Sequence, residues 1–336
     1  MTNPLRQTTR RRIICGSVAA STLAMAAPMR MANAQDAGTL PGTLRILVGS
    51  AGAGPDLIAR VMADALRATH GWNVIVENRV GAAGIIAIEA TKAAPPDGLT
   101  MMLLSIELLT LYPLVYKKLS YDSFNDFVPV AGLTSSPYAL AVNAKAGHET
   151  LAQFISWCKA NPRTAAFATP GLGTPQQFLG IMLGRDAGIE YNHIPYKGGA
   201  PAMQDLLGNQ ISSAITAYAT AAAQARSGGI RILAHSGQAR LKTAPEIPTF
   251  RELGFANVVA EGDFIVSAPA KAPAELVRRI SNAMVAQTRS ETFRAAVAKL
   301  GQDPLVAGPS EVLERMQRNH ALWAGIVKTM SFQGLE

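Results

Sequence analysis

Two glycine-rich turns are the clearest places where this chain could bind a small ligand. Residues 169–177 read TPGLGTPQQ and residues 50–56 read SAGAGPD, and each turn separates a short apolar run from a helical stretch. Glycines let several backbone N–H groups point into one small volume, and the start of a helix adds partial positive charge. Each turn is therefore a candidate receptor for a carboxylate or phosphate. Taken alone, either one also fits an ordinary strand-to-helix turn.

The first turn lacks the known nucleotide-binding patterns. A dinucleotide fingerprint that starts at Gly52 and Gly54 would need glycine at position 57, which is Leu57, and the Gly-Lys-Ser/Thr ending of a phosphate loop is also missing. Two such turns in two separate α/β units instead suggest two lobes that face one another across a cleft.

Residues for catalysis or metal binding are sparse. The five histidines (70, 148, 193, 235 and 320) are scattered without metal-ligand spacing, and Ser236 lacks the glycine two residues earlier that a nucleophile elbow requires. The candidate site offers only Asp56 and Asp263 as titratable groups, so we expect no enzyme activity, metal or cofactor. An α/β hydrolase or decarboxylase acting on a small organic acid is the alternative, and a ligand-presenting sensor is a third possibility.

The N-terminal residues 1–34 have the pattern of a cleavable secretory signal. A basic head precedes an uncharged stretch over 13–29, and Ala-Asn-Ala closes it at 32–34. Residues 9–14, TRRRII, fit twin-arginine export, with the Sec route as the alternative. We therefore expect a periplasmic protein that begins near Gln35. The removed segment holds five arginines and no acid, so the net charge of +8 falls to +3, and no basic cluster for nucleic acid remains.

The elements that position the two turns alternate between strand and helix. Strands are expected over 44–49, 73–77 and 100–105, with helices over 56–71 and 84–94 between them. This order predicts an α/β fold with a largely parallel sheet. Further strands are expected at 128–133, 138–143, 164–169, 191–195, 211–216 and 231–236, and the C-terminal region is expected to hold helices near 273–288, 291–300 and 309–329.

Ordered sequence blocks across nearly the whole chain resemble the Bug family, the extracytoplasmic solute receptors of tripartite tricarboxylate transporters. The blocks include VIVENRVGAAG (74–84), AAPPDG (93–98), YKKLSYDSFNDFVPVAGLTSSP (116–137), ATPGLGTPQQ (168–177), HIPYKGGAPAMQDLLGNQ (193–210) and APEIPTFRELGF (244–255). The block at 193–210 is the most specific of them.

The resemblance implies a two-lobed periplasmic binding protein of the Venus-flytrap type, type II, with a cleft between two α/β domains that are joined by two chain crossings. Lobe one would comprise 38–105 and 226–336, and lobe two would comprise 106–225. The ligand would be a small carboxylate held by the turn at 50–56 and opposed by the turn at 169–177. The implied partners are membrane subunits of a tripartite tricarboxylate-type transporter, and the receptor is expected to be a monomer that binds no nucleic acid.

The ligand-binding residues expected on this basis come from both turns and from strand ends that face the cleft. They are Ser50, Ala51, Gly52, Gly54, Asp56, Ser105, Thr169, Pro170, Gly171, Gly173, Thr174, Gln177, Tyr196, Thr216 and Asp263. Several positions depart from the family pattern. The first turn is one residue shorter than the usual Pro-Pro-Gly-Gly-Gly-Thr-Asp run, Gln177 replaces a common histidine, Thr216 replaces an aspartate, and Asp263 replaces a tryptophan. These changes should alter which groups other than the carboxylate the pocket accepts.

Overall fold

A computed structural model describes residues 38–52, 54–330, 332, 334 and 335. The predicted signal segment at 1–34 lies outside these residues. Among the described helices, none is long and apolar enough to cross a membrane.

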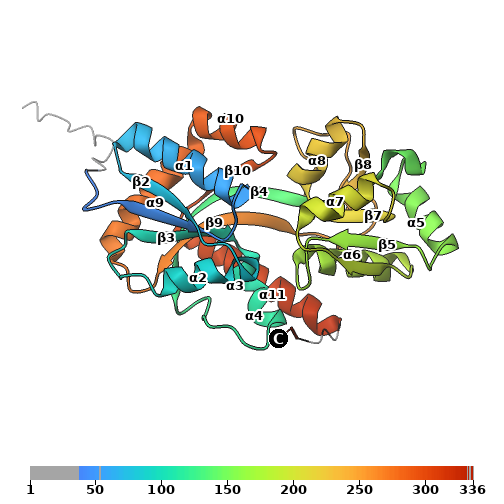
Figure 1. Cartoon of the computed structure of the whole chain (residues 1–336), viewed down its shortest axis with the longest axis horizontal. Coiled ribbons are helices and arrows are strands. Elements are labelled where there is room, and N and C mark those ends of the chain that lie inside the picture. The colour runs from blue at the N-terminus through green and yellow to red at the C-terminus, as the bar shows by residue number, and fades with distance from the viewer. Residues whose placement is uncertain (1–37, 53, 331, 333, 336) are drawn as a thin grey trace, which may run out of the picture. The chain divides into compact units, whose positions relative to one another are not determined.

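The described strands form one mixed sheet in the order β2-β1-β3-β9-β4-β7-β5-β6, with β8 and β10 also paired to β4 (Figure 1). The strands are β1 (Leu44–Val48), β2 (Val74–Asn78), β3 (Thr100–Ser105), β4 (Phe127–Asn143), β5 (Ala166–Thr169), β6 (Asn192–Pro195), β7 (Ser213–Ala217), β8 (Ile230–His235), β9 (Glu261–Pro269) and β10 (Asp303–Ala307). β1 pairs in parallel with β2 and β3, and β5 pairs in parallel with β6 and β7. Each α/β half therefore has its own parallel core.

β4 connects the two halves because it is long enough to pair in both. Its N-terminal part pairs antiparallel with β9 and β10, and its C-terminal part pairs antiparallel with β7 and β8. β9 also pairs antiparallel with β3. The middle of the sheet is thus antiparallel, and the expectation of a largely parallel sheet is wrong there.

The strands expected separately at 128–133 and 138–143 are one strand, and β9 and β10 were not expected. Pro129 lies inside the first expected strand and Pro137 lies between the two, although proline removes a donor from a ladder. The structure accommodates Pro129 at a register shift between Pro129 and Ala131, while Pro137 pairs opposite Glu261. A β-bulge of this kind absorbs an irregular residue without ending the strand.

Helices flank the sheet in both halves. They are α1 (Gly54–His70), α2 (Ile85–Lys92), α3 (Glu107–Thr110), α4 (Tyr112–Val115), α5 (Leu151–Ala160), α6 (Pro175–Ala187), α7 (Gly199–Leu207), α8 (Tyr218–Arg226), α9 (Ala274–Arg289), α10 (Glu291–Lys299) and α11 (Pro309–Thr329). The spacing of apolar residues explains which face of α1 is buried. Ile58, Met62 and Leu66 recur every four residues and are all fully buried. They pack with strand residues such as Ile46 in one apolar cluster.

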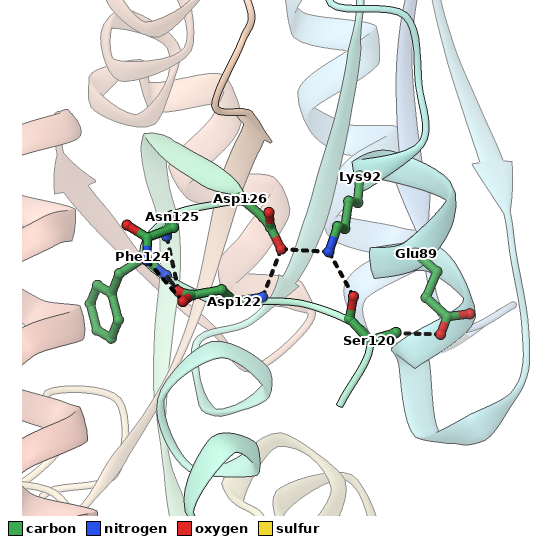
Figure 2. Close-up of polar contacts among 7 residues, drawn as sticks. All are labelled: Glu89, Lys92, Ser120, Asp122, Phe124, Asn125 and Asp126. Carbon is green, nitrogen blue, oxygen red and sulfur yellow. Dashed lines mark hydrogen bonds and ion pairs between the residues drawn. The ribbon is translucent and has the colours of Figure 1, made fainter. Parts of the chain in front are cut away.

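Part of the sequence block at 116–137 forms a polar network that fixes the loop before β4. Figure 2 shows its seven residues, Glu89, Lys92, Ser120, Asp122, Phe124, Asn125 and Asp126. Asp122 accepts hydrogen bonds from the backbone N–H groups of the two residues at 124 and 125, which fixes a tight turn. Lys92 of α2 contacts Asp126 at 2.8 Å and donates to the carbonyl of Ser120 at 2.7 Å. This part of the motif therefore fastens a loop to α2.

Candidate functional site

A cavity of about 260 Å³ lies against the first glycine-rich turn. Gly49, Ser50 and Pro55 line it from the turn, and Ser105 and Leu108 line it from the end of β3 and from α3. The turn lies at the C-terminal end of β1, next to the C-terminal end of β3. Crevices outside the carboxyl ends of parallel strands are the usual ligand sites of open α/β sheets.

A second cavity, of about 200 Å³, lies against the second turn. Pro170, Thr174 and Gln176 line it from that turn and the start of α6, and Ser105 and Leu108 line it as well. Because these last two residues form part of both walls, the two cavities adjoin. The fold thus brings the two turns, more than a hundred residues apart in the sequence, to one place.

Asp56 fixes the shape of the first turn from within. It is 4% exposed, and its Oδ2 accepts from the backbone N–H of Gly52 at 2.9 Å. Its Oδ1 accepts from Asn78 at 2.9 Å and pairs with Arg60 at 2.9 Å. Burial acts to raise the pKa of Asp56, but these hydrogen bonds and the arginine outweigh it and hold the pKa below its usual value. Asp56 is therefore a charged carboxylate that is occupied within the turn.

Asn78 is a second support of this turn that the sequence reasoning did not single out. Its amide donates to the carbonyl of Ser50 at 2.6 Å as well as to Asp56. Asn78 ends β2 and lies opposite Val48 in the parallel register, so strand pairing brings it beside the turn. One sequence feature could have indicated this role: Asn78 directly follows the strand predicted over 73–77, within the VIVENRVGAAG block.

The second turn is also held by its own residues. The backbone N–H of Gly173 donates to Oε1 of Gln177 at 2.7 Å, and Gly173 has a φ of +68°. Thr174 is the N-cap residue of α6 and Pro175 follows it. The Thr174 hydroxyl donates to the carbonyl of Gly171 at 3.0 Å and does not cap the helix. The positive φ explains why glycine is needed at 173.

His193 supports the same turn from β6. Its Nε2 lies 2.7 Å from the hydroxyl of Thr169, and that hydroxyl in turn donates to the carbonyl of Gly171 at 2.9 Å. Burial lowers the pKa of His193 to about 4. The imidazole is therefore neutral at physiological pH and orders the end of the strand.

Comparison with known proteins identifies the family. The model of the tripartite tricarboxylate transporter family receptor matches residues 58–332. The chain belongs to this receptor family. It is 32% identical to Protein BugT of Bordetella pertussis over 286 residues, which cover 82% of this chain and 85% of the relative. The predicted resemblance to the Bug family is confirmed.

Solved structures confirm the fold class. The receptor aligns with periplasmic binding protein BugD at a TM-score of 0.77 and 26% identity, covering 87% of this chain and 99% of the other. It aligns with the R. palustris protein Rpa4515, solved with adipate, at a TM-score of 0.82 and 26% identity, covering 88% and 99%. The receptor therefore has the mixed α/β, two-lobed fold of type II periplasmic binding proteins.

The structure brings some of the predicted site residues to the cavity walls. Ser50, Ser105, Pro170 and Thr174 line the two cavities. Eight further predicted residues belong to the two turns or to the helix starts that follow them: Ala51, Gly52, Gly54, Asp56, Thr169, Gly171, Gly173 and Gln177. Tyr196 donates to Asp205 at 2.7 Å, Thr216 is buried near Gly199, and Asp263 pairs with Arg315 of α11 at 2.8 Å. Ligand contact by the predicted residues stays a prediction.

Glu107 is the acidic wall residue among those that the sequence did not predict, which also include Leu108, Tyr138 and Gln302. It is 1% exposed, lines the second cavity, and accepts hydrogen bonds from the Tyr138 hydroxyl at 3.0 Å and from the Ser105 hydroxyl. Burial raises the pKa of Glu107 to about 7, and the nearby charge of Asp263 adds to the increase. Its position two residues after a predicted strand was the available signal, since that is the edge of the sheet where ligands bind.

Proposed function

We propose that the receptor is a periplasmic solute-binding protein that captures a small organic carboxylate between its two lobes. In this proposal it delivers the solute to membrane subunits of a tripartite tricarboxylate-type transporter. The observation that carries the proposal is the meeting of the two glycine-rich turns at adjoining cavities that share Ser105 and Leu108. The family match and the adipate of a structural neighbour at 26% identity support the choice of ligand class.

The two turns supply the chemistry that a carboxylate needs. α1 and α6 begin beside the cavities, so their positive dipole ends and free backbone N–H groups favour an anion. The side chains that fix each turn, Asp56 and Gln177, already accept the N–H groups of Gly52 and Gly173. We therefore propose that the turns are preorganised, and that the neighbouring N–H groups bind the ligand.

Lobe closure is part of the proposal. The predicted boundaries place the crossings near residues 105 and 226. β8 pairs with the C-terminal part of β4, in the half that contains β7, which favours a return crossing after β8 and before β9. We propose that β4 carries the forward crossing and that closure rotates the lobes about these segments. A ligand that touches both turns would stabilise the closed state because it has more contacts there.

Export by a cleavable twin-arginine signal completes the proposal. Its support is the sequence pattern of residues 1–34. These residues lie outside the part of the chain that the structure describes.

Thermal-shift screening against a library of carboxylates, followed by titration calorimetry, tests the ligand class. A ligand that binds only the native state raises the unfolding temperature, and we expect one site per chain. Leu108→Trp should abolish binding because the larger ring fills the wall shared by both cavities. The matched control is Leu313→Trp, at a 38% exposed position of α11, which should bind normally.

Two results would contradict the proposal. Binding of the same ligand with unchanged affinity by Leu108→Trp would place the site elsewhere. Conversion of the bound acid into a product, seen by chromatography after incubation, would favour the hydrolase or decarboxylase alternative.

A further inference from the structure

The described residues that line the two cavities include an acidic side chain but no basic one. Of the described residues that line them, Glu107 is the one with an ionisable carboxyl group, and Lys, Arg and His are absent from both walls. Two arginines near the cavities are already paired with carboxylates, Arg315 with Asp263 and Arg60 with Asp56. A first carboxylate can be held by backbone N–H groups at the turns, but a second one has no cationic side chain to meet.

Glu107 can accept about one further hydrogen bond. A carboxylate has about four acceptor positions, and Glu107 uses one for Tyr138, one for Ser105 and one for its own backbone N–H. The two side-chain donors also fix the carboxyl group in place, because Tyr138 lies on β4 and Ser105 ends β3. The group is therefore a positioned acceptor at the wall of the second cavity.

Gln302 adds a second acceptor to the same wall. It is 6% exposed, lines the second cavity, and its Oε1 has no hydrogen-bond partner among the described residues. A buried polar atom without a partner is costly, and a bound ligand that donates a hydrogen bond would relieve that cost. Two buried residues that carry acceptor oxygens, Glu107 and Gln302, thus line the same cavity.

We propose that the receptor selects carboxylates that carry a hydrogen-bond donor, a hydroxyl or an ammonium group, at the end remote from the bound carboxylate, and that Glu107 with Gln302 recognises this donor. The inference rests on the proposed function and narrows its ligand class. It excludes simple dicarboxylates as preferred ligands, because their second carboxylate would meet two acceptors and a like charge.

Titration calorimetry at about pH 8 with four matched series of straight-chain acids tests this inference. The series are unsubstituted monocarboxylates, ω-hydroxy acids, ω-amino acids and dicarboxylates, each of four to six carbons. At equal length, we expect the best hydroxy or amino acid to bind at least about tenfold more tightly than the dicarboxylate, since a hydrogen bond to a charged group contributes about that much. The difference between hydroxy and amino acids identifies which donor is preferred.

Variants connect the preference to the two acceptors. Glu107→Gln should reduce the tenfold preference to about threefold or less, because it removes the charge and retains the shape. Gln302→Met should weaken binding of the donor-bearing acid and leave the unsubstituted acid unchanged, and it keeps the test valid if the first variant does not fold. The control Glu314→Gln removes the same charge from an exposed position of α11 and should retain the full preference.

The possible failures are distinguishable. Dicarboxylates that bind as tightly as the hydroxy and amino acids, or a preference that survives both Glu107→Gln and Gln302→Met, would overturn this inference and leave the proposed function intact. If no acid of any series binds the folded wild-type protein, the proposed function fails, and the inference fails with it.

Discussion

The contribution of Glu107 to the stability of the ligand-free receptor should fall as the pH rises. Burial raises the pKa of this carboxyl group from its ordinary value of 4.5 to about 7. Below 4.5 the group is protonated in both the folded and the unfolded chain. Between 4.5 and 7 the unfolded chain releases the proton while the folded chain keeps it, so stability decreases with pH in this window. Above 7 both states are ionised and the loss is complete.

The magnitude follows from the size of the pKa change. At about 1.4 kcal/mol for each unit of pKa, the ionised carboxylate destabilises the folded state by about 3 kcal/mol. Glu107→Gln cannot ionise and retains a similar shape. The variant should therefore gain stability relative to the wild type between about pH 5 and about pH 8, by up to about 3 kcal/mol.

Thermal unfolding of the wild type and Glu107→Gln at these two pH values measures the effect. At roughly 1.6 °C per kcal/mol for a chain of about 300 residues, the difference in unfolding temperature between variant and wild type should change by about 4 °C. All other titrating groups are shared by both proteins, so their contributions cancel in the comparison. Glu314→Gln, the exposed control, should follow the wild type. If Glu107→Gln differs from the wild type by the same amount at both pH values, the reasoning on this buried carboxyl group is refuted.

Four further predictions concern the turns, the motion and the export of the receptor. Asp56→Ala should lower the unfolding temperature and weaken carboxylate binding at least about fivefold, since a buried hydrogen-bonded charge is lost and the N–H of Gly52 is released; unchanged affinity would remove the first turn from the site. Gly173→Ala should cost more stability than Gly188→Ala and should alone weaken binding, because both positions have positive φ but only at 173 would the new Cβ lie 2.9 Å from a neighbouring side chain; equal costs would contradict this. Small-angle scattering should show a smaller radius of gyration with saturating ligand, and identical curves for free and bound protein would argue against closure. Replacing Arg10 and Arg11 by Lys should leave precursor in the cytoplasm, whereas normal export would indicate the Sec route.

The sequence by itself determined the local elements and the family. The two glycine-rich turns lie between a strand and a helix where their composition predicted them, with Thr174 and Pro175 at the start of α6. Apolar periodicity predicted α1, and ordered motifs across the chain identified the receptor family. These features depend on residues that are near one another in the sequence, such as a glycine with positive φ or a proline at the first helical position.

Only the tertiary structure decided which distant residues share the site. Glu107 meets Tyr138, and both line one cavity with Gln302, because β4 continues through Pro137 and pairs with β9, a strand that the sequence pattern did not reveal. In the same way, strand pairing brings Asn78 beside the first turn, where its amide donates to Asp56. Periodicity reports which face of an element is buried. It carries no information about register or about which partner a polar group finds, because these are set by the packing of elements far apart in the chain.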